Sequence, residues 1–291
     1  MSKVLEVRML KSKKEKSERL ESTIYPGDCL DFLEKIPDES IKLIVTSPPY
    51  NIGKEYEKKR QLQEYLKIQD RVISECVKKL KPDGSICWQV GNFVQNGAIT
   101  PLDIVLYPMF TKHGLHLRNR IAWTFGHGLH CSKRLSGRYE VILWFTKSDK
   151  YTFNLDPIRV PQKYPNKTYY FGSRKGQLSC NPLGKNPSDV WDIPNVKYKH
   201  IEKTEHPAQF PVALVERLVL SLTNKGDTVF DPYMGSGTTA IAALMHGRNS
   251  LGSEKETKYI DIMCERLNLL CQNKLRTRPM NKPIAKPSDL S

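Results

Sequence analysis

The stretch VFDPYMGSGTT, residues 229–239, joins an apolar run to a segment with helical spacing. Residues 227–230 predict a short buried strand, and residues 238–246 predict a helix. Glycines between a strand and a helix let the backbone pass close to a ligand, and doubly wound sheets bind ligands in the crevice at this end of their strands. The stretch therefore predicts an α/β fold with a ligand at the carboxyl end of its strand.

The glycine spacing of this stretch excludes two common phosphate-binding loops. It is not the GxGxxG dinucleotide fingerprint, and no lysine follows Gly237 as it would in a P-loop. The next predicted strand, residues 250–252, leads to Glu254. Its distance from the loop suits a carboxylate that accepts hydrogen bonds from ribose hydroxyls. The pattern indicates a nucleoside ligand without a triphosphate.

Strand and helix patterns alternate on both sides of this stretch. We predict strands at residues 22–25, 41–45, 85–90, 118–125 and 139–145, and helices at 31–35, 61–80, 104–113, 211–222 and 259–272. Residues 81–84, Lys-Pro-Asp-Gly, predict a turn. The alternation implies a doubly wound, mostly parallel, Rossmann-like sheet.

The predicted strand at residues 41–45 ends in Thr46-Ser47-Pro48-Pro49-Tyr50. Neither proline has an N–H to donate to a sheet ladder, so the strand must stop here. A rigid turn at the exit of a buried strand is typical of a site in which one backbone direction has to be held.

Residues 156–205 interrupt the α/β alternation with six prolines and little periodicity. Basic residues and aromatic residues are interleaved in this segment, a composition that suits a surface for phosphates and unstacked bases. A long ordered loop packed on the sheet is the alternative. Candidate phosphate contacts in the segment are Lys163, Lys167, Arg174 and Lys175. A second basic cluster comprises Lys133, Arg134 and Arg138.

Charge and composition favour a soluble cytoplasmic protein that binds a polyanion. The 291 residues include 46 Lys and Arg against 31 Asp and Glu, a net charge of +15 that favours nucleic acid. No apolar run approaches the length of a membrane span. The seven cysteines form no CxxC pair, and His127, His130 and Cys131 lack a second half-site, so we predict neither a disulfide framework nor a metal site.

Four motifs in order resemble those of the S-adenosylmethionine-dependent DNA amino-methyltransferases. DPYMGSGTT is similar to their cofactor motif, and TSPPY to their catalytic motif. Gly27-Asp28 resembles the segment that contacts the cofactor's adenine, and residues 206–211, HPAQFP, the segment near its methionine end. The catalytic motif precedes the variable segment and the cofactor motif, which is the order of the class called beta.

The resemblance implies a role for each motif. Ser47 and the Pro48 carbonyl would accept hydrogen bonds from the amino group of a base flipped out of double-stranded DNA. Pro49 would help to hold that carbonyl, and Tyr50 would stack on the base. The cofactor residues implied are Asp28, Pro207, Phe210, Asp231, Pro232, Met234, Gly235, Ser236, Gly237, Thr238, Thr239 and Glu254.

The target base stays open at this point. In the family, serine at the first catalytic position usually accompanies N4 of cytosine and aspartate accompanies N6 of adenine, so Ser47 slightly favours cytosine. A methyltransferase acting on RNA or another amine is the alternative, followed by a non-catalytic nucleic-acid-binding relative. The resemblance also raises a cognate restriction endonuclease and a homodimer as possible partners.

The motifs divide the chain into five regions. Residues 1–20 form a basic arm, predicted to be flexible or a solvated helix, and 273–291 a flexible basic tail. The methyltransferase domain has a catalytic half at 21–155 and a cofactor-binding half at 206–272. Residues 156–205 are the predicted target-recognition region between them.

Overall fold

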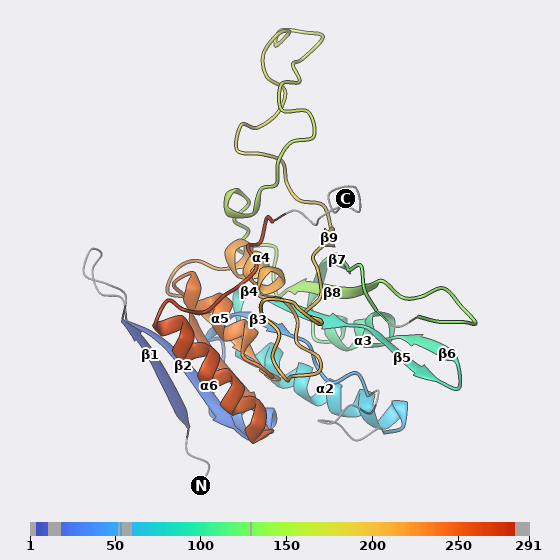
Figure 1. Ribbon diagram of the computed structural model, residues 1–291, viewed down its shortest axis with the longest axis vertical. Coiled ribbons are helices and arrows are strands. Elements are labelled where there is room, and N and C mark those ends of the chain that lie inside the picture. The colour runs from blue at the N-terminus through green and yellow to red at the C-terminus, as the bar shows by residue number, and fades with distance from the viewer. Residues whose placement is uncertain (1–3, 11–18, 52, 54–59, 129, 283–291) are drawn as a thin grey trace.

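A computed structural model describes residues 4–10, 19–51, 53, 60–128 and 130–282. Its centre is a nine-stranded sheet with the order β1-β2-β11-β10-β3-β4-β8-β7-β9 (Figure 1). The strands are β1 Leu5–Leu10, β2 Arg19–Pro26, β3 Ile41–Thr46, β4 Leu80–Val90, β7 His116–Thr124, β8 Tyr139–Thr146, β9 Val190–Asp192, β10 Thr228–Asp231 and β11 Asn249–Glu254. Strands β5 Asn92–Gln95 and β6 Ala98–Pro101 form a separate antiparallel hairpin.

Five strands, β2, β11, β10, β3 and β4, run parallel to one another. Strand β8 is antiparallel to β4 and to β7, and the short β9 is parallel to β7. The mostly parallel α/β sheet that the sequence predicted is therefore confirmed.

Helices cover both faces of the sheet. They are α1 Cys29–Leu33, α2 Leu62–Lys79, α3 Leu102–Thr111, α4 Val212–Leu222, α5 Thr238–Met245 and α6 Thr257–Cys271. Along β3, Leu43 and Val45 join the core beneath α4, α5 and α6, whereas Ile44 joins the core beneath α1, α2 and α3. Successive strand residues face opposite sides, so two apolar layers explain why β3 is buried throughout.

Three predictions about local structure were wrong. Residues 5–10 form β1 on the sheet edge, antiparallel to β2, and not a flexible arm or a helix, whereas residues 1–3 and 11–18 of the predicted arm lie outside the described residues. Residues 81–84 do not form a separate turn, because β4 begins at Leu80 with a shift in its register against β3. Residues 273–282 of the predicted flexible tail pack on the body, because Leu275 and Met280 contact the core and the Arg278 N–H donates to Glu202 at 2.8 Å; residues 283–291 lie outside the described residues.

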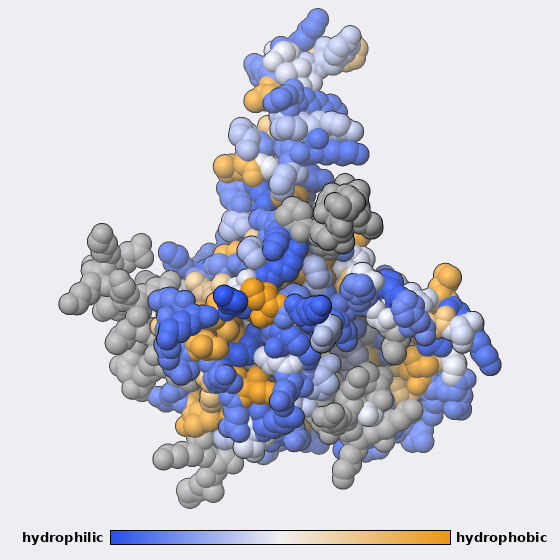
Figure 2. Space-filling model, in the orientation of Figure 1, coloured by the Kyte–Doolittle hydropathy of each residue, from blue (hydrophilic) through white to orange (hydrophobic). Residues whose placement is uncertain are grey.

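Residues 159–187 form a finger that projects from the body between the short 3₁₀ helix Asp156–Ile158 and β9 (Figure 1). Its two arms exchange backbone hydrogen bonds, including a reciprocal pair between Val160 and Lys185 at 2.9 and 3.0 Å. Its surface is mostly hydrophilic (Figure 2). Beyond it, Trp191, Ile193 and Val196 are buried against the body. The segment at 156–205 thus combines a projecting part and a packed part.

In the part of the chain that the structure describes, no helix has both the length and the apolar character needed to cross a bilayer.

Candidate active site

The catalytic and cofactor motifs leave the sheet side by side. Strands β3 and β10 are parallel neighbours, with Phe230 opposite Ile44. Ser47-Pro-Pro-Tyr50 follows β3, and Asp231-Pro-Tyr-Met-Gly235 follows Phe230, so both emerge at the same edge. The fold therefore brings together two motifs that lie about 180 residues apart in the chain. In α/β enzymes, ligands bind at such a topological switch point, where neighbouring parallel strands lead to connections on opposite sides.

Asp231 connects the two motifs inside the protein. One carboxylate oxygen accepts from Thr46 Oγ1 at 2.6 Å and from the Tyr233 N–H at 3.0 Å, and the other accepts from Thr239 Oγ1 at 2.6 Å. Asp231 has no exposed surface, and burial raises its pKa to about 6. The sequence analysis placed Asp231 among the cofactor contacts. Its position indicates that it holds the two strand ends and helix α5 in register.

The glycines of the cofactor loop are required by close contacts. Gly235 and Gly237 have φ angles of +50° and +76°. A Cβ at Gly235 would lie 2.8 Å from His206 Nε2, and one at Gly237 would lie 2.4 Å from Met263 Cγ. Any other residue would be strained and would collide, so the loop backbone stays bare towards the crevice.

Glu254, at the end of β11, binds this loop through its side chain. One oxygen accepts from the Gly235 N–H at 2.8 Å, and the other accepts from the N–H groups of Lys255 and Glu256 at 2.9 and 3.0 Å. Burial raises the pKa of Glu254. Oε1 therefore accepts two hydrogen bonds and Oε2 accepts one, so Oε2 keeps a lone pair to which a ribose hydroxyl can donate without displacing these bonds.

Asp28 lies next to Glu254. The Gly27 N–H donates to the Glu254 carbonyl at 2.9 Å, which joins the two segments. Asp28 caps helix α1 through the Leu30 N–H at 2.8 Å and pairs with Lys255 Nζ at 2.5 Å. Burial acts to raise the pKa of Asp28, but the Lys255 hydrogen bond and the Leu30 N–H outweigh it and the pKa is lowered.

Several predicted cofactor residues face inward. Ser236, Thr238 and Thr239 are buried, as is Met234, whose N–H donates to the Ser253 carbonyl at 2.9 Å. Pro232 accepts a hydrogen bond from Ser253 Oγ through its carbonyl at 2.8 Å. The side chains of these residues are therefore enclosed within the protein.

Arg266 on α6 is a residue that the sequence analysis missed. Its Nη1 donates to the Ser236 carbonyl at 2.6 Å, to Ser236 Oγ at 3.0 Å and to Thr238 Oγ1 at 3.1 Å. Burial lowers its pKa to about 10. The available signal was an arginine beside Met263 and Leu267 on an otherwise apolar helix face. Arg266 clamps the loop from behind.

The HPAQFP segment lies against the same loop. The His206 ring packs edge-on against Tyr259 with 4.3 Å between centroids, and its Nδ1 accepts from the Ala208 N–H at 3.2 Å. Phe210 is buried and Pro207 is partly buried. The structure thus places His206 beside Gly235, and the Phe210 carbonyl accepts from Thr238 Oγ1 at 3.3 Å.

His206 makes stability depend on pH. Burial lowers its pKa from 6.5 to about 4, so between these values the unfolded chain binds a proton that the native state refuses. Stability therefore falls as the pH falls through this window. We expect the advantage of the wild type over His206→Gln to shrink by about 3 kcal/mol from pH 7 to pH 4. Urea unfolding at several pH values measures this, with His116→Gln as an exposed control. Parallel curves for wild type and His206→Gln would contradict it.

At the catalytic end, four polar side chains from three strand ends meet. Ser47 Oγ lies 3.1 Å from Tyr50 Oη. Tyr50 Oη lies 2.7 Å from Gln89 Oε1 and 3.2 Å from Glu140 Oε2, and Gln89 Nε2 donates to Glu140. Gln89 ends β4 and Glu140 begins β8, and the sequence analysis missed both. Nothing in a single sequence pairs them with the SPPY turn, because only the strand order brings them together.

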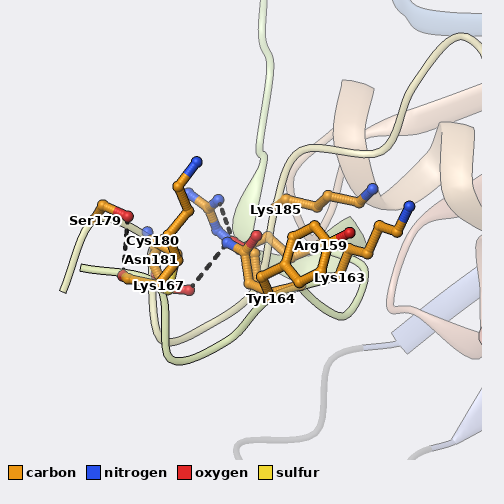
Figure 3. A pocket seen from close by; sticks show the side chains of 10 residues that line it. Arg159, Lys163, Tyr164, Lys167, Ser179, Cys180, Asn181 and Lys185 are labelled. Atoms are coloured by element: carbon orange, nitrogen blue, oxygen red, sulfur yellow. Dashed lines mark hydrogen bonds between the residues drawn. The ribbon is translucent and has the colours of Figure 1, made fainter. Parts of the chain in front are cut away.

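The predicted phosphate contacts fall into three places. Lys163 and Lys167 line a hollow of about 360 Å³ in the finger, together with Arg159, Tyr164 and Lys185 (Figure 3). Arg174 lies further along the finger, stacked on the Tyr169 ring at 4.7 Å, and Lys175 is exposed beside it. The second cluster, Lys133, Arg134 and Arg138, lies between β7 and β8, where Arg134 donates to the Gly97 carbonyl of the β5–β6 hairpin at 3.2 Å.

A family model described as DNA methylase matches residues 41–265, a range that contains both motifs and the sheet edge between them. The chain belongs to this DNA methylase family. Type II methyltransferase M.BglII from Bacillus subtilis is 53% identical over 240 residues, which cover 82% of this chain and 67% of the relative. DNA adenine methyltransferase YhdJ from Escherichia coli K12 is 36% identical over 254 residues, which cover 85% of this chain and 83% of the relative.

The fold of this methylase also matches that of solved structures. PvuII DNA methyltransferase (cytosine-N4-specific) superposes with a TM-score of 0.67 over 90% of this chain and 96% of the other, at 23% identity. The methylase is an enzyme that uses S-adenosylmethionine and methylates amino groups in DNA, as the motif order predicted. The RNA methyltransferase and non-catalytic alternatives are not favoured.

Proposed function

We propose that this methylase transfers the methyl group to N4 of a cytosine flipped out of double-stranded DNA. The observation that carries this proposal is Ser47, a neutral acceptor, at the first catalytic position where β3 leaves the sheet. A base inside a duplex hides its amino group in the stack, so the nucleotide must be extruded to reach Ser47.

Three groups of the turn act on the base. Ser47 Oγ and the Pro48 carbonyl accept the two N–H bonds of the amino group, which favours a more tetrahedral nitrogen with an available lone pair. The Pro48–Pro49 pair holds this carbonyl in place, so little reorganisation accompanies the reaction. The Tyr50 ring stacks on the base, and its hydroxyl is held by Gln89 and Glu140.

The residues around Gly235 fit S-adenosylmethionine, which supplies an already activated methyl group when bound. The bare backbone of Gly235 and Gly237 suits the methionyl part. Glu254 Oε2 keeps a lone pair for a ribose hydroxyl, and Asp28, which is kept ionised by Lys255, faces the adenine edge. Pro207 and Phe210 supply apolar contacts, and the loop from Pro232 to Thr239 holds its shape through Asp231 and Arg266.

N6 of adenine is the second candidate for the target. The observation that favours it is the 36% identity to YhdJ, which is named an adenine methyltransferase. The two methylated nucleosides differ in mass and in chromatographic retention, so they can be distinguished directly. DNA methylated by the purified enzyme is digested to nucleosides and analysed by mass spectrometry. N4-methyldeoxycytidine supports the proposal, whereas N6-methyldeoxyadenosine alone would overturn the choice of base.

We propose the finger as the DNA-recognition surface. The described lining of its hollow contains four cationic side chains and no carboxylate side chain, and Tyr164 adds an exposed aromatic face. Cations at a hollow suit backbone phosphates, and an exposed ring suits a base. A cognate restriction endonuclease and a homodimer stay predictions; the former is supported by relatives named Type II methyltransferases.

Removing finger cations should weaken DNA binding and flatten its salt dependence. We expect Lys163→Ala with Lys167→Ala, and separately Arg174→Ala with Lys175→Ala, to lower affinity about tenfold and the salt slope by up to about 2. Affinity measured at several salt concentrations tests this.

Lys150→Ala with Lys225→Ala is the matched control for the finger variants, because both lysines are exposed and lie outside the finger. Cofactor affinity should not change in any of the three pairs. An unchanged salt slope in both finger pairs would move the DNA surface to Lys133, Arg134 and Arg138.

A further inference from the structure

A serine hydroxyl at the catalytic position raises a question about its hydrogen. A hydroxyl is both a donor and an acceptor, and a substrate amino group offers only N–H bonds before reaction. Ser47 Oγ assists that amino group only if its own hydrogen points elsewhere. An aspartate at this position would have no such ambiguity, because an ionised carboxylate only accepts.

The side chains around Ser47 settle where the hydrogen goes. Glu140 cannot donate when it is ionised, so the Gln89 amide must turn its NH₂ group towards this carboxylate. The Gln89 carbonyl oxygen then faces Tyr50 Oη at 2.7 Å, and Glu140 Oε2 is a second acceptor at 3.2 Å. The Tyr50 hydrogen is therefore directed at Gln89 or Glu140.

The Tyr50 oxygen is left as an acceptor. Its neighbour at 3.1 Å is Ser47 Oγ, so the Ser47 hydrogen points to Tyr50. The lone pairs of Ser47 then remain for the substrate. A chain of polarised hydrogen bonds of this kind strengthens each member. The direction of the whole chain originates at Glu140.

We propose that Glu140 is a positioning residue that, through Gln89 and Tyr50, keeps the Ser47 hydroxyl oriented as an acceptor for the amino group of the target base. This inference rests on the proposed function. An aspartate in the catalytic turn would accept the N–H bonds of the base directly. Here the Glu140 carboxylate on β8 would instead ensure that Ser47 does so.

The surroundings of Glu140 show that its charge does not stabilise the fold through a salt bridge. Among the residues that the structure describes, no lysine, arginine or histidine nitrogen lies within 4.0 Å of its carboxylate, so Glu140 has no salt-bridge partner there. Glu140 is partly buried, and a carboxylate withdrawn from water without a paired cation costs stability. Such a cost is tolerated at sites where the charge has a function.

The charge also matters during the reaction. The nitrogen forms a bond to the methyl carbon as the carbon–sulfur bond breaks, so positive charge develops on the amine before its proton is lost to solvent. An ionised Glu140, linked to Ser47 through Tyr50, stabilises this charge in a site of low dielectric. Neutralising Glu140 removes both this stabilisation and the fixed direction of the chain.

Acid should therefore slow the enzyme through Glu140. Burial raises the pKa of this carboxyl, against the opposing hydrogen bonds from Gln89 and Tyr50 and the charge of Lys197. The titratable groups acting on it in the described part of the chain are thus Tyr50, from the turn after β3, and Lys197, from the segment after β9. A protonated Glu140 becomes a donor, which allows the Gln89 amide and the hydroxyls to reverse.

The test is a double-mutant cycle on single-turnover methyl transfer, with Glu140→Gln, Tyr50→Phe and the pair. Cofactor and DNA are saturating, so the rate reports the chemical step. Each single variant should be about tenfold slower. Tyr50→Phe keeps the stacking ring but removes the link, so adding Glu140→Gln to it should cost little more. The acid limb of the rate–pH profile should disappear in Glu140→Gln.

Glu216→Gln is the matched control. Glu216 lies on α4, away from the catalytic turn, and its carboxylate is 2.8 Å from His246 Nε2. Replacing Glu216 with glutamine should leave the methyl-transfer rate unchanged. Melting temperatures and the Kd values for cofactor and for DNA distinguish a variant that is misfolded from one in which only the methyl-transfer step is slower. Additive effects of the two substitutions, or a wild-type rate for Glu140→Gln, would overturn the inference. If wild-type protein produces no methylated base, the proposed function fails instead.

Discussion

Replacing Ser47 with alanine should slow methyl transfer on the order of a hundredfold, while the Kd for S-adenosylmethionine stays unchanged. Ser47 Oγ is the proposed acceptor for the amino group of the base, and it makes no described contact with the Gly235 loop. Its removal leaves one N–H of the amine without an oriented partner when positive charge develops. The substitution therefore weakens the stabilisation of the transition state and leaves cofactor binding unchanged.

Single-turnover rates with saturating DNA, together with calorimetry of cofactor binding, measure this effect. Ser40→Ala is a matched control, because Ser40 lies at the other end of β3 and its hydroxyl donates to the Pro37 carbonyl at 2.7 Å. Equal losses of rate and cofactor affinity in Ser47→Ala would contradict the assignment. They would indicate that the turn supports the cofactor loop rather than the base.

Replacing Glu254 with alanine should raise the Kd for S-adenosylmethionine by about 10- to 100-fold. Hydrogen bonds to a charged group are worth about 1.5–3 kcal/mol each, and Glu254 is the carboxylate that we propose for the ribose hydroxyls. The variant also frees the Gly235 N–H, which Glu254 holds at 2.8 Å, so the loop loses part of its preorganised shape. DNA affinity should change little, since Glu254 lies on the cofactor side of the site.

Calorimetric titration of the variant with S-adenosylmethionine measures the change. Glu256→Ala is a suitable control, because Glu256 is an exposed acid two residues away that caps α6 only through its backbone. If Glu254→Ala binds the cofactor as the wild type does, then Glu254 has a structural role in holding Gly235 and Lys255.

Buried strands and loops with special backbone requirements were predictable from the sequence. The apolar run in β3 stops at Pro48 because prolines end a ladder, and Gly235 and Gly237 adopt positive φ angles that other residues avoid. Helix α3 forms although it contains Pro108, as its apolar spacing predicted. Each of these features depends on residues close together in the chain.

Short or polar elements were not predictable in this way. Strand β9 has three residues, and the β5–β6 hairpin has four in each strand, so neither shows a clear alternation. Strand β1 looked like a solvated arm because its structure comes from pairing with β2 at the sheet edge. Leu275 and Met280 order part of the tail through contacts with a core that only the folded chain contains.

The sequence by itself determined the α/β class, the order of the motifs, and the turn chemistry of the catalytic and cofactor loops, because periodicity, proline and glycine act over a few residues. Only the tertiary structure decided which side chains support those loops. Arg266 reaches Ser236 from another helix, and Glu140 reaches the SPPY turn from β8, across β4. Such contacts follow from the order of strands in the sheet, which sets distances between residues far apart in sequence.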